Sequence, residues 1–426
     1  MALHPAPSVL VKDVLIYNGL GQPESELQDI LVLGGHISAI GTGLTEPEGA
    51  IIIEGKGAAV IPGLFDMLAN CGEPRHEHLE TFSSLSDTAL AGGFTGIAIA
   101  PNADSAADSQ DYNHFVRHKG SQYGCDIYPF AAISQQQKGQ KLADLIDLQH
   151  AGAVGYFDGS APIQNTDLMV KALQYARHTG LMVINRPEDH CLAQFGQMHE
   201  GLTSTLLGLK AIPSLAEVMM VKRDLDLLRH VGGRLHLSCL STAEAVDLVR
   251  AAKAEGLAVS ASVSVAQLLF TDEDLTNLDS NLKAEPPFRS EADKSALLAG
   301  LKDGTIDVIV TNHTPLDIES KRLEFDMASP GIIMLQTALP ALLTAYPDQD
   351  LGFWLPKLGH NARALLSLAQ PRISVGEVAQ FVVIDPDQAF EFSAKVNKSK
   401  SANTPFFNKK LKGRILASVH HKISIY

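Results

Sequence analysis

The sequence has little that would bind nucleic acid, cross a membrane or form a disulfide framework. Its formal net charge of −14 over 426 residues argues against a phosphate backbone or an anionic membrane as partner. No apolar run approaches the roughly 20 residues that span a bilayer. The four cysteines are scattered and include no C-x-x-C pair. A reduced, cytoplasmic protein is therefore expected.

Several common catalytic motifs are also missing. The chain has no G-x-S-x-G elbow, no P-loop and no H-E-x-x-H pair, which removes the usual signatures of serine hydrolases, P-loop nucleotidases and zincins. No G-x-G-x-x-G follows a first strand, which argues against a doubly wound dinucleotide-binding sheet. Hydrophobic residues make up 45% and charged residues 19% of the chain, an ordinary globular balance with enough apolar material for a large core.

What is present is an alternation of strands and helices. Short β-branched runs give eight strand candidates at 64–66, 96–100, 126–130, 153–156, 181–184, 234–237, 258–263 and 306–310. Helical stretches separate many of them, at 81–91, 166–178, 214–231 and 243–255. This alternation predicts an α/β fold built as a (β/α)8 TIM barrel.

Both ends of the chain show the period-two pattern of half-buried strands instead. The pattern occupies residues 11–17, 29–33 and 36–40, and it returns at 379–385 and 413–419. We therefore expect a small β-sandwich domain built from both termini, with residues 1–60 and 366–426 flanking a barrel at 61–365. The segment 393–408, rich in Lys, Ser and Asn, is predicted to be an exposed loop.

Reactive side chains of such a barrel lie at the C-terminal ends of its strands. Asp158 precedes a glycine after one strand, so it is either a turn residue or a carboxylate ligand. Arg186 either pairs with Asp158 in place of a cation or is a solvated loop arginine. Cys239 is a competent zinc ligand, although a lone cysteine on a strand is more often a small buried hydrophobe.

The first and last strands carry poor metal ligands. Leu68 cannot ligate an ion, and Asn70 is a weak neutral ligand. Asn312 cannot serve as a carboxylate base, while His313 either titrates or acts as a structural hydrogen-bonding residue. Metal-assisted hydrolysis needs an ion that acidifies a bound water, and these residues supply few ligands for one.

Together, the segments resemble the dihydroorotase branch of the cyclic amidohydrolases nearly end to end. The matching segments are 62–63, 91–95, 101–102, 152–153, 212–217, 240–242, 268–274, 286–290, 302–309, 398–400, 403–406 and 411–413, with His236. The family interconverts N-carbamoyl-aspartate and dihydroorotate with zinc. By this resemblance, the first-strand histidines, the bridging acid, the two later histidines and the last-strand aspartate correspond to Leu68, Asn70, Asp158, Arg186, Cys239 and Asn312.

The resemblance also implies substrate contacts. The arginine that grips a carboxylate corresponds to Gly72, and an expected asparagine corresponds to Glu285, whose charge has the wrong sign for an anionic substrate. Asn102 matches a substrate-contacting asparagine. The resemblance thus implies no functional catalytic residue, no cofactor, and at most Asp158 and Cys239 as metal ligands.

These substitutions predict a catalytically inactive dihydroorotase-like protein of pyrimidine biosynthesis. Non-catalytic chains resembling this one serve as assembly partners of aspartate transcarbamoylase in some bacteria, which implies a structural or regulatory role. Barrels of this kind often self-associate, so a homo-oligomer is expected.

Two alternatives stay open. One is an active zinc-dependent dihydroorotase with an altered site, in which Asp158, Cys239 and either His236 or His313 hold the ion. The other is a small-molecule sensor in which Arg186 and Asn102 hold an anionic pyrimidine precursor.

Overall fold

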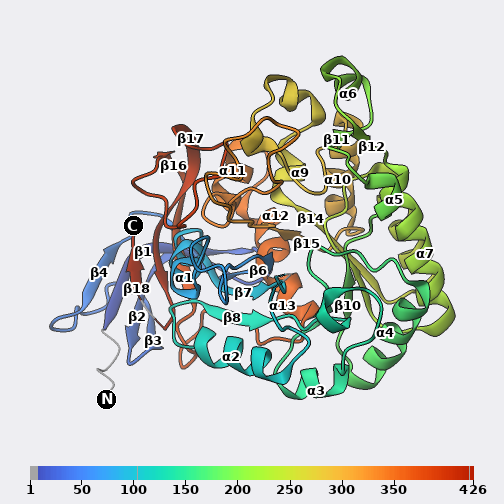
Figure 1. Ribbon diagram of the computed structural model, residues 1–426. Helices are drawn as coiled ribbons and strands as arrows, with labels where there is room; N and C mark the ends of the chain where they lie inside the picture. Colours follow the sequence, from blue (N-terminus) through green and yellow to red (C-terminus); the bar gives the residue numbers. More distant parts are fainter. Residues whose placement is uncertain (1–7, 103, 422) are drawn as a thin grey trace.

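The computed structural model describes residues 8–102, 104–421 and 423–426, and its centre is a ring of parallel strands (Figure 1). The strands are β6 (Leu64–Ala69), β7 (Phe94–Ile99), β8 (Asp126–Pro129), β9 (Tyr156–Phe157), β10 (Val183–Asn185), β13 (Leu235–Leu237), β14 (Val259–Ser264) and β15 (Val308–Val310). They pair in two sheets, β6-β7-β8 and β9-β10-β13-β14-β15. Parallel bridges from Ala131 to Tyr156 and from Ala69 to His313 join the two sheets, so the strands close into the expected barrel.

Helices cover the outside of this barrel between successive strands (Figure 1). They are α1 (Phe82–Ala91), α2 (Gln110–Gly120), α3 (Leu145–His150), α4 (Thr166–Thr179), α7 (Leu215–Val231), α8 (Ala243–Ala254) and α10 (Glu291–Asp303). Local sequence sets several ends: Thr81 forms a capping box at the start of α1, and Gly180 ends α4 in the left-handed conformation.

Short elements fill the longer connections. An excursion before α7 contains α5 (His190–Ala193), β11 (Met198–His199), α6 (Leu202–Leu207) and β12 (Ala211–Ile212). Further helices are α9 (Val265–Leu269), α11 (Ala338–Ala345), α12 (Leu351–Leu355) and α13 (Asn361–Leu365). Among the described residues, no helix combines the length and apolar character needed to cross a membrane.

Strands from both ends of the chain meet in a single eight-stranded sheet beside the barrel. They are β1 (Val9–Tyr17), β2 (Pro23–Leu33), β3 (His36–Gly41), β4 (Ile51–Glu54), β5 (Ala59–Pro62), β16 (Phe381–Phe392), β17 (Lys409–Val419) and β18 (Ile423–Ile425). The order is β18-β17-β16-β5-β1-β2-β3, with β4 paired to β1. The antiparallel pair β5–β16 joins the two ends, as the sequence suggested. Folding of this sheet into a two-layered sandwich stays a prediction.

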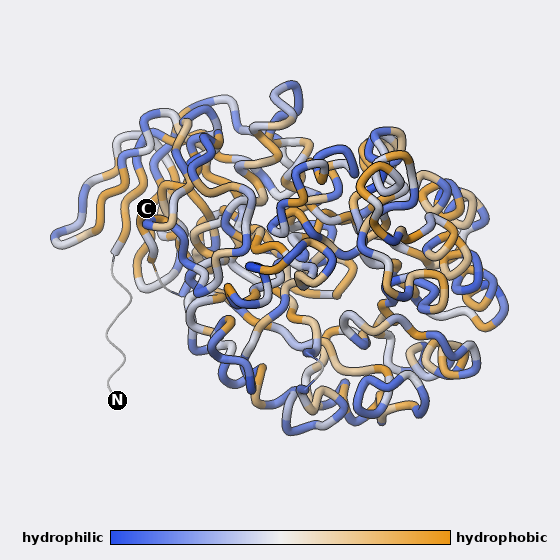
Figure 2. The backbone as a smooth tube through the Cα atoms, turned by 45° about the horizontal axis from the view of Figure 1, so that its top comes forward, coloured by the Kyte–Doolittle hydropathy of each residue, from blue (hydrophilic) through white to orange (hydrophobic). Residues whose placement is uncertain are grey.

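Apolar side chains fill the interior of the barrel. Phe65, Phe130 and Val308 belong to one buried cluster together with Leu68 and Cys239. Hydrophilic stretches gather in the peripheral loops, whereas hydrophobic stretches run through the strands (Figure 2). The lumen is therefore a packed core, and the C-terminal ends of its strands are where a barrel of this kind carries an active site.

Candidate functional site

The C-terminal ends of the barrel strands surround a cavity of about 280 Å³. Its lining includes most of the residues singled out from the sequence: Leu68, Asn70, Gly72, Asn102, Arg186, Cys239 and Asn312. This volume lies near the lower end of small-molecule pockets, so the mouth is open and Leu68 does not plug it. The fold brings these positions together from strands far apart in sequence.

Leu68 and Cys239 form the apolar floor of this cavity. Both belong to the cluster that fills the barrel, and their exposed fractions are 7% and 1%. Burial raises the pKa of the Cys239 thiol to about 12, against a weaker opposing effect of the Ser238 hydroxyl. The thiol therefore stays protonated at neutral pH, and Cys239 behaves as a small buried hydrophobe.

Arg186 pairs with Glu285 across the cavity. Its Nη2 donates to Glu285 Oε1 at 2.8 Å and to the Ser160 carbonyl at 2.6 Å. Only 13% of the Arg186 side chain is exposed. Neither interpretation of Arg186 is correct: the guanidinium is mostly buried, and its carboxylate partner is Glu285, 99 residues further along the chain, rather than Asp158.

Asp158 does not line this cavity, and groups of the loop after β8 hold its carboxylate. Oδ1 accepts hydrogen bonds from the Ile133 and Ser134 amides at 2.6 and 3.0 Å, and Oδ2 accepts one from the Ser134 hydroxyl. Burial nevertheless raises the pKa of Asp158 to about 6, against the lowering effect of those bonds. Asp158 would have to give up these bonds before it could ligate an ion at the mouth.

The two asparagines at ligand positions use their amide groups as donors. Asn70 Nδ2 donates to the His313 carbonyl at 3.1 Å and to the Thr314 hydroxyl at 3.0 Å. Asn312 Nδ2 donates to the Glu285 carbonyl at 3.0 Å. These bonds tie the loops after β6 and β15 to their neighbours.

Gly72 leaves no room for the arginine that the resemblance places there. A Cβ at Gly72 would lie 2.0 Å from the His76 carbonyl oxygen and 2.9 Å from the Glu80 carbonyl oxygen. Both contacts are with backbone, which cannot move aside cheaply. The loop after β6 is therefore built around a glycine.

Asn102 stabilises its own loop. Its Nδ2 donates to the Pro74 carbonyl at 3.3 Å, and its Oδ1 accepts from the Asp104 amide at 3.1 Å. It lines the cavity, so its contact with a substrate stays a prediction.

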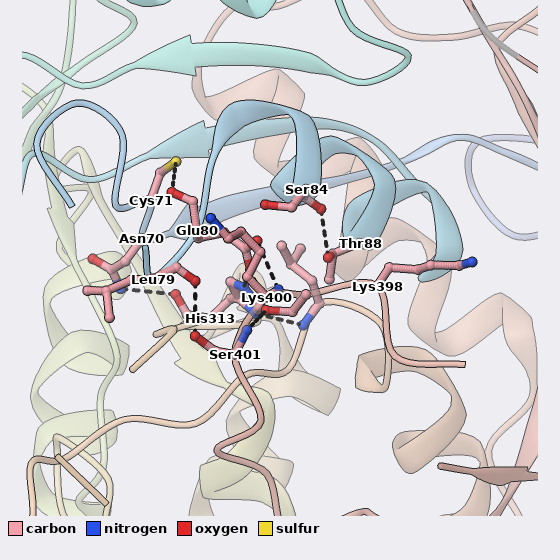
Figure 3. A network of polar contacts seen from close by, with 12 residues as sticks. Asn70, Cys71, Leu79, Glu80, Ser84, Thr88, His313, Lys398, Lys400 and Ser401 are labelled. Atoms are coloured by element: carbon pink, nitrogen blue, oxygen red, sulfur yellow. Dashed lines mark hydrogen bonds and ion pairs between the residues drawn. The ribbon is translucent and has the colours of Figure 1, made fainter. Parts of the chain in front are cut away.

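His313 lies in a buried network beneath the mouth (Figure 3). Its Nδ1 accepts from the Met334 amide at 3.1 Å, and its Nε2 lies 3.6 Å from Glu80 Oε2. The Ser399 hydroxyl donates to the same Glu80 oxygen. His313 therefore acts as a structural hydrogen-bonding residue, which is one of the two interpretations that its sequence position allows.

The same network corrects part of the prediction that 393–408 is an exposed loop: the segment is a loop and 394–396 are exposed, but its second half is largely buried. Ser399, Ser401 and Asn403 are buried. Asn403 Nδ2 donates to the Thr314 carbonyl at 2.8 Å, which holds this segment under the loop after β15. A polar composition predicted exposure, but tertiary hydrogen bonds satisfy these polar groups inside the protein.

His236 does not reach the cavity either. Its Nδ1 and Nε2 lie 2.9 and 3.1 Å from the hydroxyls of Ser260 and Ser262. Burial lowers the pKa of His236 to about 3, so the ring is neutral. Neither His236 nor His313 joins Asp158 and Cys239 in a group of close donor atoms among the described residues.

Zinc, which the resemblance implies at this mouth, does not fit these side chains. The carboxylate of Glu285 pairs with a guanidinium, and Cys239 is a buried thiol. Arg186 adds a positive charge where an ion would need anionic or neutral donors. Within the described part of the chain, no group of three His, Cys, Asp or Glu donors gathers at the cavity.

The backbone at the mouth nevertheless keeps an unusual conformation. Cys239 and Asn312 have φ angles of 56° and 48°, in the left-handed region. Such strained positions cost on the order of 1–3 kcal/mol and cluster at active sites. Two residues that line the mouth therefore have strained backbone, as do other residues away from it such as Lys56 and Ser367.

Comparisons with known proteins agree with this architecture. The Dihydro-orotase-like family model matches residues 57–245. A dihydroorotase of Pelobacter propionicus is 36% identical over 414 residues, covering 96% of this chain and 98% of the relative. One from a Geobacter species is 38% identical over 394 residues, covering 92% and 93%.

Solved structures with the same fold are more distant in sequence. An L-hydantoinase from Arthrobacter aurescens superposes with a TM-score of 0.84 at 20% identity, covering 98% of this chain and 97% of that one. A D-hydantoinase from a Thermus species gives 0.81 at 22% identity, covering 98% and 95%. These two likenesses show the fold alone. On the sequence relatives, which extend over nearly the whole length, the chain belongs to the dihydroorotase-like family.

Proposed function

We propose that this chain is a catalytically silent dihydroorotase-like protein of pyrimidine biosynthesis. The observation that carries the proposal is the ion pair of Arg186 and Glu285 inside the mouth cavity, with 2.8 Å between Nη2 and Oε1. Arg186 stands where the resemblance places a metal ligand, and Glu285 stands where it places a substrate-contacting asparagine. Their charges neutralise each other, and Arg186 brings a cation to the cavity where the resemblance implies a metal ion.

The chemistry of the family reaction explains why this pair matters. Hydrolysis of a cyclic amide at neutral pH needs an ion that lowers the pKa of a bound water. A site that holds such an ion presents donor atoms with free lone pairs. At this mouth the side-chain amides of Asn70 and Asn312 donate hydrogen bonds to backbone carbonyls. The buried carboxylate of Asp158 is occupied as well, because it accepts a hydrogen bond from the Ser134 amide.

For a chain without turnover, we propose a structural or regulatory role as a partner of aspartate transcarbamoylase. This part of the proposal rests on the resemblance to non-catalytic chains that have this role. A homo-oligomer within such an assembly belongs to the same proposal.

Sedimentation velocity tests the partner role. The purified chain is run alone, with aspartate transcarbamoylase from the same source, and with an unrelated barrel enzyme as control. The proposal expects a faster-sedimenting species that contains both proteins and is absent from the control mixture. Independent sedimentation of the two proteins at micromolar concentrations would contradict the partner role and leave the question of turnover to a separate assay.

A small-molecule sensor is the second candidate, and the open cavity of about 280 Å³ favours it. Arg186 is a poor anchor for an anionic ligand because Glu285 already holds it. A ligand of this site would raise the melting temperature without being turned over. Dihydroorotate and N-carbamoyl-aspartate are the probes to add in a thermal-shift measurement.

A further inference from the structure

A second group of donor side chains lies at the end of the barrel opposite the cavity. Asp126 is the first residue of β8, and parallel pairing with β7 places it at the N-terminal end of the barrel strands. His420 and His421 follow β17 directly, in the connection to β18. The group thus joins a barrel strand to the sheet formed by the chain ends.

The two imidazoles share the one carboxylate. His420 Nε2 lies 3.1 Å from Asp126 Oδ2, and His421 Nε2 lies 3.1 Å from Oδ1. The two ring centroids are 3.9 Å apart. The three ligand atoms all lie within 4.8 Å of one another, and no other such group exists in the described part of the chain.

The two Nε2–oxygen separations of 3.1 Å are close to the spacing of ligand atoms around a transition-metal ion. Zinc binds imidazole nitrogen and carboxylate oxygen at about 2.0–2.1 Å, so ligand atoms of a tetrahedral site lie roughly 3.3 Å apart. Two imidazoles and one carboxylate are also an ordinary donor set for zinc, cobalt or nickel.

The surroundings hold the group in place and leave a path to solvent. The His420 side chain is 4% exposed, that of Asp126 22% and that of His421 51%. At the end of β17, the Ser418 hydroxyl donates to the Leu90 carbonyl of α1 at 2.7 Å, which fixes the strand that carries the histidines. Asp126 makes no salt bridge with a lysine or arginine among the described residues.

We propose that Asp126, His420 and His421 bind one divalent transition-metal ion, with Zn²⁺ as the fitting example, and that water completes its coordination. Binding needs both Nε2 atoms unprotonated, so any proton carried there leaves to solvent. The ion connects Asp126 with two histidines that lie 294 and 295 positions further along the chain. Because the donors meet only in the folded chain, binding stabilises the folded state. The site is independent of the function proposed for the mouth.

Metal titration of the full chain tests this site. The chain, stripped of metal by a chelator, is titrated with Zn²⁺ in a calorimeter and with Co²⁺ in a spectrophotometer, where tetrahedral cobalt gives visible absorption. His421→Asn is the main variant because its half-exposed side chain can change without disturbing the core. Asp126→Asn is the second variant, and His178→Asn, on the exposed face of α4, is the control for histidine content.

We expect one Zn²⁺ per chain, with affinity falling at least about tenfold in His421→Asn and in Asp126→Asn. The His178→Asn control should bind as the natural chain does. Unchanged binding in both ligand variants, or no saturable Zn²⁺ binding, would overturn the site. Loss of Zn²⁺ binding in Cys239→Ala, with full binding in His421→Asn, would also overturn it and would place the ion at the mouth.

Discussion

The two ends of the barrel contain similar chemical groups in opposite arrangements. At the mouth, Arg186 and Glu285 hold each other, and Asp158 is held by backbone amides. At the other end, Asp126 presents each of its two oxygens to an imidazole nitrogen. For the proposed site we infer that metal binding depends on donors that are free of a permanent cation and of backbone amides, a condition that the mouth does not meet.

The largest expected effect is stabilisation by zinc through the Asp126 end. At a free Zn²⁺ concentration of about 100 times Kd, an ion that binds only the folded state adds about 2.7 kcal/mol to the free energy of unfolding. Differential scanning calorimetry should show a rise of a few degrees in the melting temperature. His421→Asn should remove that rise and Cys239→Ala should keep it; the reverse pattern would break the comparison.

Breaking the ion pair at the mouth should have the next largest effect. Glu285→Gln leaves the Arg186 guanidinium without its carboxylate partner. Loss of one partner of a buried pair costs about 3–5 kcal/mol, but the Glu285 side chain is 36% exposed. Solvent screening therefore reduces the expected loss to about 1–2 kcal/mol in urea unfolding.

The double variant Arg186→Met with Glu285→Gln is the matched control. It removes both charges, so it should recover most of the stability that Glu285→Gln alone loses. Equal stability of the natural chain and both variants would mean that the pair contributes nothing to the fold of the mouth.

A smaller effect concerns pH. Burial raises the pKa of Asp66 to about 7 and that of Asp158 to about 6, from an ordinary value of 3.8. Between pH 3.8 and about 7 the folded chain then binds more protons than the unfolded one. These two groups therefore make the free energy of unfolding fall as pH rises through that window.

Asp158→Asn should remove part of this slope, on the order of 1 kcal/mol between pH 4 and 7. Urea unfolding at pH 4.5, 6 and 8 measures it. Asp167→Asn, on the surface of α4, is a control for loss of one carboxylate. A steeper fall of stability with rising pH in Asp158→Asn would contradict the effect assigned to burial.

The smallest expected effect is on zinc binding at the mouth when only the two first-strand histidines are introduced. Leu68→His together with Asn70→His should bind no additional zinc, because Arg186 stays in the cavity and Asp158 stays bonded to Ile133 and Ser134. Zinc content by atomic emission, in a His421→Asn background, isolates the mouth. A zinc ion retained in that background would mean that the mouth still has a usable donor set.

The sequence predicted the barrel and the meeting of the two chain ends because both depend on local patterns. β-branched runs and helical stretches alternate along the chain, and such patterns are read over short windows. The bridge between Ala69 and His313 joins the first and last barrel strands and closes the ring. Eight alternating strands already imply such closure.

The orientations of the polar side chains could not be predicted in the same way. The partner of Arg186 depends on a contact 99 residues away, and the donors around Asp158 come from the loop after β8. The polar composition of 393–408 predicts exposure because it does not reveal the buried partner Glu80, to which Ser399 donates a hydrogen bond. Of the Asp126 group, only the adjacent histidines His420 and His421 are visible as a pattern in the sequence. Their carboxylate partner lies 294 residues away from His420, so the sequence alone does not reveal it.

The most direct measurement is the interconversion of N-carbamoyl-aspartate and dihydroorotate by the purified chain with zinc supplied. Cys239→Ala and Asp158→Ala, purified in the same way, control for a contaminating host enzyme. We expect no turnover above the level of these two variants. Turnover by the natural chain that disappears in either variant would contradict it, because the mouth would then contain a working catalytic centre.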